Sequence, residues 1–489
     1  MNKYIGIDLG TSSVKILLVD TEGAIIKTVS REYPIFYPQS GWSEQNPTDW
    51  YDATIDGLKE LLLGVDKKTV KGISFGGQMH GLVILDENDE VIRPAILWND
   101  GRTSKETEYL NAVIGQDNLM NYTANIAFAG FTAPKILWVK ENEPESFARI
   151  KKIMLPKDYL AYKLSGVFAT DYSDASGMLL LDVKNKCWSE KMCEICSVKI
   201  DTLPTLFESY EKIGTLLPKI ASELELDEIT IAIGAGDNAG AAIGTGISKG
   251  GACNVSLGTS GTVFISQDNF ISNDCGALHN FCHANGKYHL MGCILSAASC
   301  NKWWVEEILG SNDFRFEEDG LLSLIGENDV YFLPYLMGER TPHNDVDAKG
   351  AFIGMRPSTT RKEMTLAVLE GVAYALRDSL ELAKASGCKI EATKVCGGGA
   401  KSEVWRKILA NVFGIPVIRP LIEEGPAYGG AILAMVADGV YRNVEEATDK
   451  LVKDKDVTYP DTKITEKYEK KYQTFTKMYP ALKALYKEI

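Results

Sequence analysis

A short strand–turn–strand pattern occurs twice in this chain of 489 residues, and the repetition constrains the fold more than any other feature. The first copy is YIGIDLGTSSVKILLVD at residues 4–20, and the second is ACNVSLGTSGTVFI at residues 252–265. Both place Leu-Gly-Thr-Ser between two apolar runs, which is typical of a β-hairpin with a tight polar tip. Two copies about 250 residues apart predict two similar domains in tandem.

The hairpin tips have the composition of phosphate-binding turns. Glycine allows a ligand close to the backbone, threonine and serine add hydroxyl groups, and consecutive N–H groups form a concavity that binds anions. Ordinary turn chemistry would explain either copy alone, but it explains their recurrence poorly. We therefore expect Thr11 and Ser12 to bind a polyphosphate from one side, and Thr259 and Ser260 from the other.

The segment ITIAIGAGDNAGAAIGTG, residues 229–246, predicts a buried strand, a glycine turn and the start of a helix. Asp237 and Asn238 fall at the turn, and open α/β sheets bind their ligands at the carboxyl ends of strands. A carboxylate here is a candidate ligand-binding group. A helix N-cap is the alternative role, since both residue types are favoured at that position.

Two other segments resemble each other, namely KGISFGGQMHG at residues 71–81 and KVCGGGAKS at residues 394–402. Each predicts a short strand that ends in a glycine turn, downstream of one of the hairpins. The second precedes a predicted helix at residues 403–413 with apolar residues on one side. Bare glycine backbone at Gly398 and Gly399 suits contact with a flat ring or a phosphate, and a plain strand–helix turn remains the alternative.

Composition limits the partners and the compartment. A net charge of −14 argues against a nucleic-acid surface or an anionic membrane as a partner. Asp8 and Gly10 interrupt the apolar start, so no secretory signal is expected, and no uncharged apolar run reaches the roughly 18 residues of a membrane span. Ten scattered cysteines then suggest reduced thiols and a cytoplasmic protein. The polar break around Ser248 predicts domains at residues 1–248 and 249–489.

These landmarks resemble the actin-like ATPase superfamily. Within it, FTAPKILW at residues 131–138, and GERTPH with GAF at residues 338–343 and 350–352, are similar to the two signatures of the FGGY family of carbohydrate kinases. Met79-His80-Gly81 and the LWND run at residues 97–100 resemble the family's xylulose kinases in particular. The resemblance runs from Tyr4 to about Asp438. It implies an α/β fold of two actin-like ATPase (ribonuclease-H-like) domains flanking a deep catalytic cleft, with sugar mainly on the first domain and nucleotide mainly on the second.

The resemblance also implies roles for individual residues. Asp237 would be the catalytic base, and Asp8 would position magnesium through water. The implied sugar-binding residues are Met79, His80, Trp98, Asp237 and Asn238, and the implied nucleotide-binding residues are Thr11, Ser12, Lys15, Thr259, Ser260, Asn301, Gly398, Gly399 and Ser402. For His80 the alternative is a structural side chain hydrogen-bonded in the core.

The implied reaction is the ATP-dependent phosphorylation of D-xylulose to D-xylulose 5-phosphate, with ATP as co-substrate and Mg²⁺ as cofactor. A carboxylate would take the proton of the attacking hydroxyl. The alternatives are a kinase of another sugar or polyol, such as L-xylulose, ribulose or gluconate, and an actin-like ATPase without a sugar substrate, such as a chaperone or filament former. The expected partners are the sugar and ATP, and a homodimer is left open.

Overall fold

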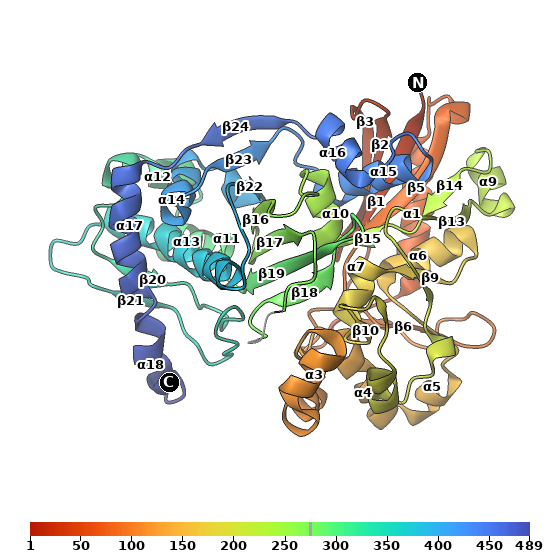
Figure 1. Cartoon of the computed structure of the whole chain (residues 1–489), viewed down its shortest axis with the longest axis horizontal. Helices are drawn as coiled ribbons and strands as arrows, with labels where there is room; N and C mark the ends of the chain where they lie inside the picture. The colour runs from red at the N-terminus through yellow and green to blue at the C-terminus, as the bar shows by residue number, and fades with distance from the viewer. Residues whose placement is uncertain (273–275) are drawn as a thin grey trace.

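The computed structural model describes residues 1–272 and 276–489, and within them it contains two mixed sheets of seven strands each. Figure 1 shows the first sheet on the right and the second towards the left. The predicted α/β class is therefore confirmed. In chain order, the first two strands of each sheet form one of the two predicted hairpins.

The first sheet has the strand order β13-β14-β5-β1-β2-β3, and β15 adds to β5. β1 pairs antiparallel with β2 and parallel with β5. The strands are β1 (Lys3–Leu9), β2 (Ser13–Asp20), β3 (Ile25–Glu32), β5 (Val70–Gly77), β13 (Lys212–Thr215), β14 (Thr230–Ala232) and β15 (Ala235–Gly236).

The second sheet has the order β18-β19-β17-β16-β22-β23-β24 and repeats the pairing of the first. β16 pairs antiparallel with β17 and parallel with β22, as β1 does with β2 and β5. The strands are β16 (Cys253–Leu257), β17 (Gly261–Gln267), β18 (His279–Cys282), β19 (Tyr288–Ile294), β22 (Thr393–Cys396), β23 (Val417–Pro420) and β24 (Asp454–Thr458). The repeat seen in the sequence is thus a repeat of topology.

Helices cover these sheets, and five two-stranded pairs lie outside them in the described residues. The α-helices are α1 (Pro47–Leu61), α2 (Ser104–Glu108), α3 (Gln116–Thr123), α4 (Thr132–Asn142), α5 (Pro144–Arg149), α6 (Pro156–Ser165), α7 (Tyr172–Ala175), α8 (Glu190–Cys196), α9 (Pro218–Leu224), α10 (Asp237–Gly244), α11 (Ala298–Trp303), α12 (Phe314–Glu318), α13 (Arg361–Ala385), α14 (Glu403–Phe413), α15 (Gly425–Ala437), α16 (Val444–Leu451), α17 (Thr462–Phe475) and α18 (Met478–Tyr486). The short strands are β4 (Glu44–Gln45), β6 (Val83–Leu85), β7 (Ala95–Ile96), β8 (Lys152–Met154), β9 (Ala169–Asp171), β10 (Leu181–Asp182), β11 (Cys187–Trp188), β12 (Thr205–Phe207), β20 (Tyr331–Leu333) and β21 (Ala351–Ile353).

α14 spans the residues that the sequence predicts, because both of its ends carry strong signals. The Ser402 hydroxyl accepts the Trp405 N–H at 3.0 Å as the N-cap, and Gly414 adopts a left-handed conformation, φ +68°, just after the helix. Val404, Ile408 and the rest of its apolar side are buried in the core of the second half.

α10 and α15 lie between the two sheets (Figure 1), and α15 packs on β1 and β5 of the first sheet although it comes late in the chain. Glycines permit this close approach. A Cβ at Gly6 would collide with the Ala427 carbonyl, and one at Gly244 would collide with the Gly425 carbonyl. The backbones of β1 and α15 therefore touch directly.

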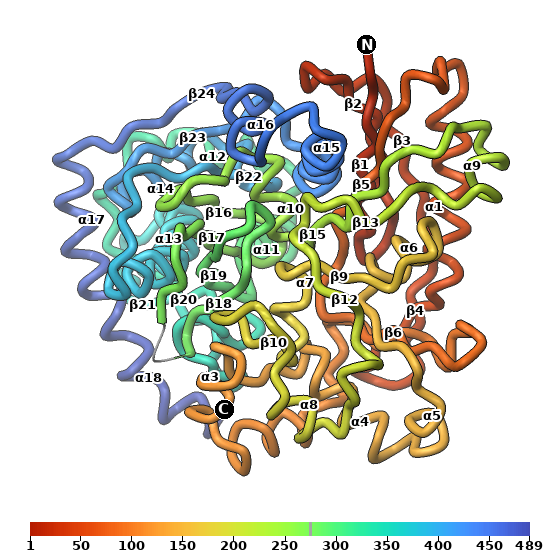
Figure 2. The backbone as a smooth tube through the Cα atoms, turned by 45° about the vertical axis from the view of Figure 1, so that its right-hand side comes forward, coloured from red at the N-terminus to blue at the C-terminus, as the bar shows by residue number. Residues whose placement is uncertain are grey.

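A further apolar cluster lies below the first sheet and joins both halves of the chain. It contains Met79 and Phe131 from the first half and Phe281 and Met291 from the second. Figure 2 shows the edge strand β18 beside α7 and β10. The second sheet thus reaches the region that carries the predicted sugar residues.

The predicted boundary between residues 248 and 249 lies in the segment between α10 and β16. It stays a prediction, because α15 belongs to the second half of the chain and yet packs on the first sheet. Across residues 1–272 and 276–489, the structure contains no helix with the length and apolar character needed to cross a membrane.

Candidate active site

The site begins where two glycine turns meet at the end of the first sheet. β15 pairs with the last residues of β5, with Ala235 opposite Gly76 and Gly236 opposite Gly77. A Cβ on Gly236 would lie 3.0 Å from the Met79 sulfur. Glycine at this position therefore lets the segment before Asp237 lie directly against the segment that carries Met79.

Asp237 is the first residue of α10, and its carboxylate is held by its neighbour. The backbone N–H and the side-chain Nδ2 of Asn238 donate to Asp237 Oδ1 at 2.7 and 3.0 Å. The N-cap position belongs to Gly236, and no side chain caps this helix. The N-cap alternative is therefore wrong for both residues.

Burial raises the pKa of Asp237 to about 6, and the hydrogen bonds from Asn238 oppose that rise. A carboxyl group with this pKa is mostly ionised at neutral pH, yet it binds a proton more readily than a carboxylate in water. Both properties suit a group that accepts a proton from a substrate.

Asp8 lies on β1, partly buried, with Lys15 of β2 as its cross-strand partner. The pKa of Asp8 is raised to about 7, mainly by burial and then by the charge of Asp237, while Lys15 opposes the rise. The two carboxylates are therefore close enough to influence each other. Lys15 Nζ also forms an ion pair at 3.0 Å with Glu424, just before α15.

The residues present fit a magnesium ion bound largely by phosphate and water. Among the described residues, no group of three or more histidine, cysteine, aspartate or glutamate side chains is placed to hold a metal. A magnesium ion here would depend on the carboxylate oxygens of Asp8. That fits the usual coordination of magnesium, which combines one or two carboxylates with waters and substrate phosphates.

The first hairpin tip is fixed by side chains from other elements. Tyr33 donates its hydroxyl to the Gly10 carbonyl, and Gln45 Nε2 donates to the Thr11 carbonyl at 2.7 Å. Trp98 Nε1 donates to Thr11 Oγ1 at 3.0 Å, so a predicted sugar residue touches a predicted phosphate residue. Ser12 at the tip is exposed.

The second tip, Gly258–Ser260, is built in the same way. The Thr259 carbonyl accepts the Ala297 N–H at 2.9 Å and the Ser299 hydroxyl at 2.7 Å, and the Thr259 and Ser260 side chains are exposed. α11 begins at this contact, and buried Asn301 lies on it. These contacts leave the exposed tip open to a ligand.

The glycine turn after β22 lies beside the second hairpin. Gly398 is exposed, with open space where a Cβ would lie, whereas a Cβ on Gly399 would press on Trp405 and Leu257. Ser402 uses its hydroxyl within the protein, because it caps α14 and donates to Glu318 at 2.8 Å. Gly398 thus offers exposed bare backbone in this turn.

His80 is locked by contacts on both its backbone and its ring. It has a positive φ of 68°, which is uncommon for a residue other than glycine. Its carbonyl accepts from Thr132 Oγ1 at 3.1 Å and from Lys135 Nζ at 2.8 Å. Its ring lies 4.8 Å from the Phe131 ring, centre to centre. The run FTAPKILW at residues 131–138 thus holds His80 in place.

The ring nitrogens of His80 have different roles. Nδ1 lies 2.9 Å from the Gly177 carbonyl, and because a carbonyl accepts only, Nδ1 carries the proton. The pKa of His80 is lowered to about 3, mainly by burial and then by the charge of nearby Lys135, so the ring is neutral. Nε2 is left as an acceptor for a hydroxyl group. The alternative role, a structural histidine hydrogen-bonded in the core, explains the contact of Nδ1 with Gly177. It gives no role to Nε2.

The structure brings four of the predicted sugar residues together, namely Met79, His80, Asp237 and Asn238, whereas Trp98 contacts Thr11. Asn238 Nδ2 lies 3.8 Å from the Met79 sulfur, and Gly177 lies against both Met79 and the His80 ring. Sequence reasoning missed Gly177, and it also missed Tyr33, Gln45 and Glu424. These four residues sit in segments without a motif, so no local signal identifies them.

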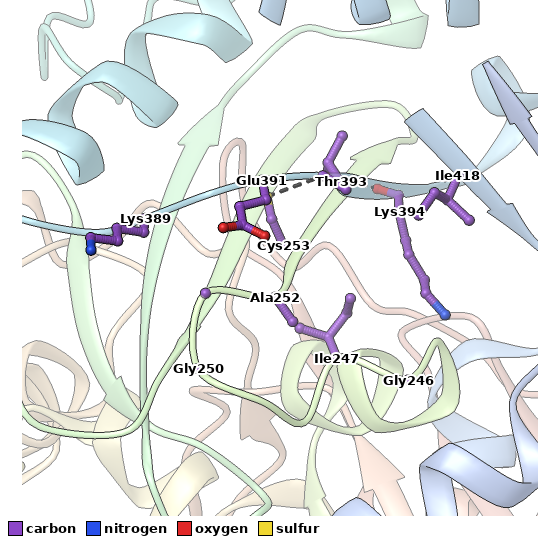
Figure 3. Close-up of a pocket in the computed structure, with 12 residues that line it drawn as sticks. Gly246, Ile247, Gly250, Ala252, Cys253, Lys389, Glu391, Thr393, Lys394 and Ile418 are labelled. Carbon is purple, nitrogen blue, oxygen red and sulfur yellow. Dashed lines mark hydrogen bonds between the residues drawn. The ribbon is translucent and has the colours of Figure 1, made fainter. Parts of the chain in front are cut away.

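A separate cavity of about 390 Å³ lies at the opposite end of the second sheet (Figure 3). It is lined by the starts of β16 and β22, including Cys253 and Thr393, and contains none of the predicted site residues. Its two lysines, Lys389 and Lys394, point in opposite directions, and Lys394 pairs with Asp454 at 2.8 Å. The lysines therefore do not converge on a common ligand.

Comparison with known proteins agrees with this architecture. The N-terminal domain of the FGGY family of carbohydrate kinases matches residues 3–244, and its C-terminal domain matches residues 253–437. The fold and these matches define a carbohydrate kinase. The chain belongs to the FGGY family.

Its relatives include xylulose kinases along their whole length. The Xylulose kinase of Escherichia coli K12 is 40% identical over 486 residues, 98% of this chain and 99% of that one. The Xylulose kinase of Bacillus subtilis 168 is 38% identical over 99% of this chain and 98% of its own. The crystal structure of ligand-bound xylulose kinase from Lactobacillus acidophilus, 25% identical, superposes with a TM-score of 0.95 over all of both chains.

Proposed function

We propose that this enzyme transfers the γ-phosphoryl group of ATP to D-xylulose and forms D-xylulose 5-phosphate. The observation that carries the choice of sugar is the 40% identity to a xylulose kinase over 98% of the chain. The packing of Met79 and His80 beside Asp237 supports it. L-xylulose, ribulose and gluconate are the competing substrates.

Asp237 acts as the general base in this proposal. A sugar hydroxyl is a weak nucleophile, and a carboxylate within hydrogen-bond reach takes its proton as it attacks phosphorus, typically a gain of about 10²–10⁴ in rate. Asn238 occupies Oδ1, which leaves Oδ2 to face the hydroxyl. His80 Nε2 accepts a second hydroxyl, so the sugar is held at two points.

The two hairpin tips hold the phosphates, with Thr11 and Ser12 on one side and Thr259 and Ser260 on the other. Phosphoryl transfer depends mainly on positioning and charge neutralisation. Lys15 supplies a positive charge near Asp8, and Gly398 and Gly399 face the adenosine. Magnesium, positioned by Asp8, would neutralise charge on the phosphates. Asn301 and Ser402 are the remaining proposed nucleotide contacts.

We also propose that residues 1–248 and 249–489 move as two domains that close on the substrates and exclude water. The proposal includes a cytoplasmic location, because ten scattered cysteines suggest reduced thiols. It does not specify whether the protein forms a dimer.

The first experiment measures ADP release with ATP and magnesium across ketopentoses, aldopentoses, polyols and gluconate. The proposal expects the highest kcat/KM with D-xylulose, by a wide margin. A higher value with another sugar would overturn the substrate and leave the phosphate machinery intact. ATP hydrolysis that no sugar accelerates would overturn the proposed reaction.

A further inference from the structure

A cluster of charged side chains lies buried below the site, outside the contacts that bind substrate. Lys157, Asp158, Asp171 and Asp174 are all fully buried. Lys157 Nζ lies 2.6 Å from Asp158, 2.8 Å from Asp171 and 3.8 Å from Asp174. Buried ion pairs of this kind contribute little net stability, because removing the charges from water offsets their attraction. Their position in the fold is therefore more informative than their charge.

The cluster is connected to the catalytic helix through one hydroxyl group. Asp171 Oδ2 accepts hydrogen bonds from the Ser173 backbone N–H at 2.8 Å and from the Ser173 hydroxyl at 2.5 Å. Ser173 Oγ in turn accepts the backbone N–H of Gly236 at 3.2 Å. A serine hydroxyl has a single proton, and Ser173 donates it in the hydrogen bond to Asp171. The lone pairs of Ser173 Oγ are therefore free to accept the N–H of Gly236.

Gly236 sets the position of Asp237. It is the N-cap of α10, and its lack of a side chain lets it lie against Met79. Gly236 is the last residue of β15, and α10 begins at the next residue. A small rotation of the backbone at Gly236 would therefore move the Asp237 carboxylate sideways. Asn238 cannot prevent this movement, because it is attached to the same helix and would move with it.

We propose that Ser173, oriented by Asp171 and Lys157, is the positioning residue that holds the catalytic base in place. This inference rests on the proposed role of Asp237. The hydrogen bond from Gly236 anchors the start of α10 to Ser173. Ser173 is itself held by the buried ion pair of Asp171 and Lys157. A misplacement of about 1 Å at a reacting group can reduce the rate about 10²-fold, so the anchor matters for turnover.

The chain contains a matched control for this anchor. Ser209 donates its hydroxyl to the same oxygen, Asp171 Oδ2, at 2.7 Å, and it is as buried as Ser173, each with about 1% of its surface exposed. The Ser209 hydroxyl makes no hydrogen bond to α10 or to Gly236 in the described structure. Removing it weakens support for Asp171 but leaves the Gly236 anchor in place.

The experiment compares Ser173→Ala and Ser209→Ala with the wild type in kcat, KM for D-xylulose and KM for ATP. We expect Ser173→Ala to lower kcat about 10- to 100-fold, with KM for ATP within about twofold of wild type. Ser209→Ala should keep kcat within about threefold. Equal losses of kcat in the two variants would overturn the proposal, since both remove one buried hydroxyl from Asp171. An intact melting transition and ATP binding show that each variant is folded.

A double-mutant cycle separates this proposal from the one on Asp237. If Ser173 acts through Asp237, Ser173→Ala has little effect on the residual rate of Asp237→Ala, so the two losses are far from additive. Multiplicative losses would overturn the positioning role and leave the base assignment standing. Near-normal turnover of Asp237→Ala alone would instead overturn the base assignment, and with it the positioning role.

Discussion

Asn238 directs two donors at one oxygen of Asp237. Its backbone N–H and its side-chain amide both reach Oδ1, at 2.7 and 3.0 Å. No described residue donates a hydrogen bond to Oδ2. The carboxylate is therefore oriented by one oxygen and left open at the other, which gives a proton acceptor a defined direction.

Replacing the base gives the most direct prediction. Asp237→Asn keeps the shape of the side chain and an oxygen for Asn238, but it lacks a strong proton acceptor. We expect kcat to fall by at least about 10². ATP affinity, measured by calorimetry, should stay within about threefold. Near-normal turnover would remove Asp237 from the mechanism.

The same substitution should stabilise the protein at neutral pH. The folded pKa of Asp237, about 6, lies above the ordinary value of 3.8, so the native state is destabilised as the group ionises. This destabilisation is absent below about pH 4 and complete above about pH 6. Asp237→Asn should therefore raise the free energy of unfolding by about 1–3 kcal/mol at pH 8, from roughly two pKa units at 1.36 kcal/mol each. Urea unfolding at pH 4 should show no such gain.

The pH dependence of turnover reports the same group. The ionised form of Asp237 is the active one, so kcat/KM should fall at least tenfold per pH unit below about pH 6. Asp8, whose pKa is raised to about 7, must also be ionised to position magnesium, so the profile should level off only above about pH 7. His80 adds no second limb in this range, because its pKa is lowered to about 3. A flat profile between pH 5 and 7, in the proposed reaction with D-xylulose, would contradict the assignment.

Gly177 offers a test of the sugar pocket in which none of the proposed ligand residues is itself substituted. A Cβ at this position would collide with the His80 ring and displace it. We expect Gly177→Ala to raise KM for D-xylulose at least about tenfold without changing KM for ATP. Gly214→Ala is the control, because its Cβ would make only ordinary contact with Val167. Equal effects of both alanines would indicate general destabilisation.

Lys15 should act on the nucleotide and not on stability. Its ion pair with Glu424 is partly exposed, and pairs that reach solvent contribute at most about 1 kcal/mol. Lys15→Met should raise KM for ATP about tenfold and leave the melting temperature nearly unchanged. Glu424→Gln removes the ion pair and keeps the lysine, so its KM for ATP should stay near that of wild type. A matching rise in Glu424→Gln would assign the effect to the ion pair.

The hairpins and the α14 helix could be predicted because their signals are local. Gly10 and Gly258 mark the tips, and Ser402 and Gly414 mark the helix ends within a few residues of what they control. Asp237 comes directly after a buried strand, so its position at the carboxyl end of that strand could be predicted as well. The repeat then fixed the class of fold.

The support of the site could not be predicted in this way. Gly236 reaches Ser173 across 63 positions, and Trp98 reaches Thr11 across 87. Such contacts depend on how separate segments pack, and no spacing within either segment encodes them. The polar run at residues 170–174 is the one visible signal, since two aspartates and three hydroxyl residues stand together there at the end of the buried strand β9.

The contact between α15 and β1 has a consequence for how the protein is made. Residues 233–424 leave the ribosome after the central strands of the first sheet and before the helix that covers them. An unfinished chain therefore exposes Tyr4 and Leu17, which α15 and its neighbours bury in the finished protein. The amino-terminal half therefore cannot bury this face of its sheet until α15 has been made.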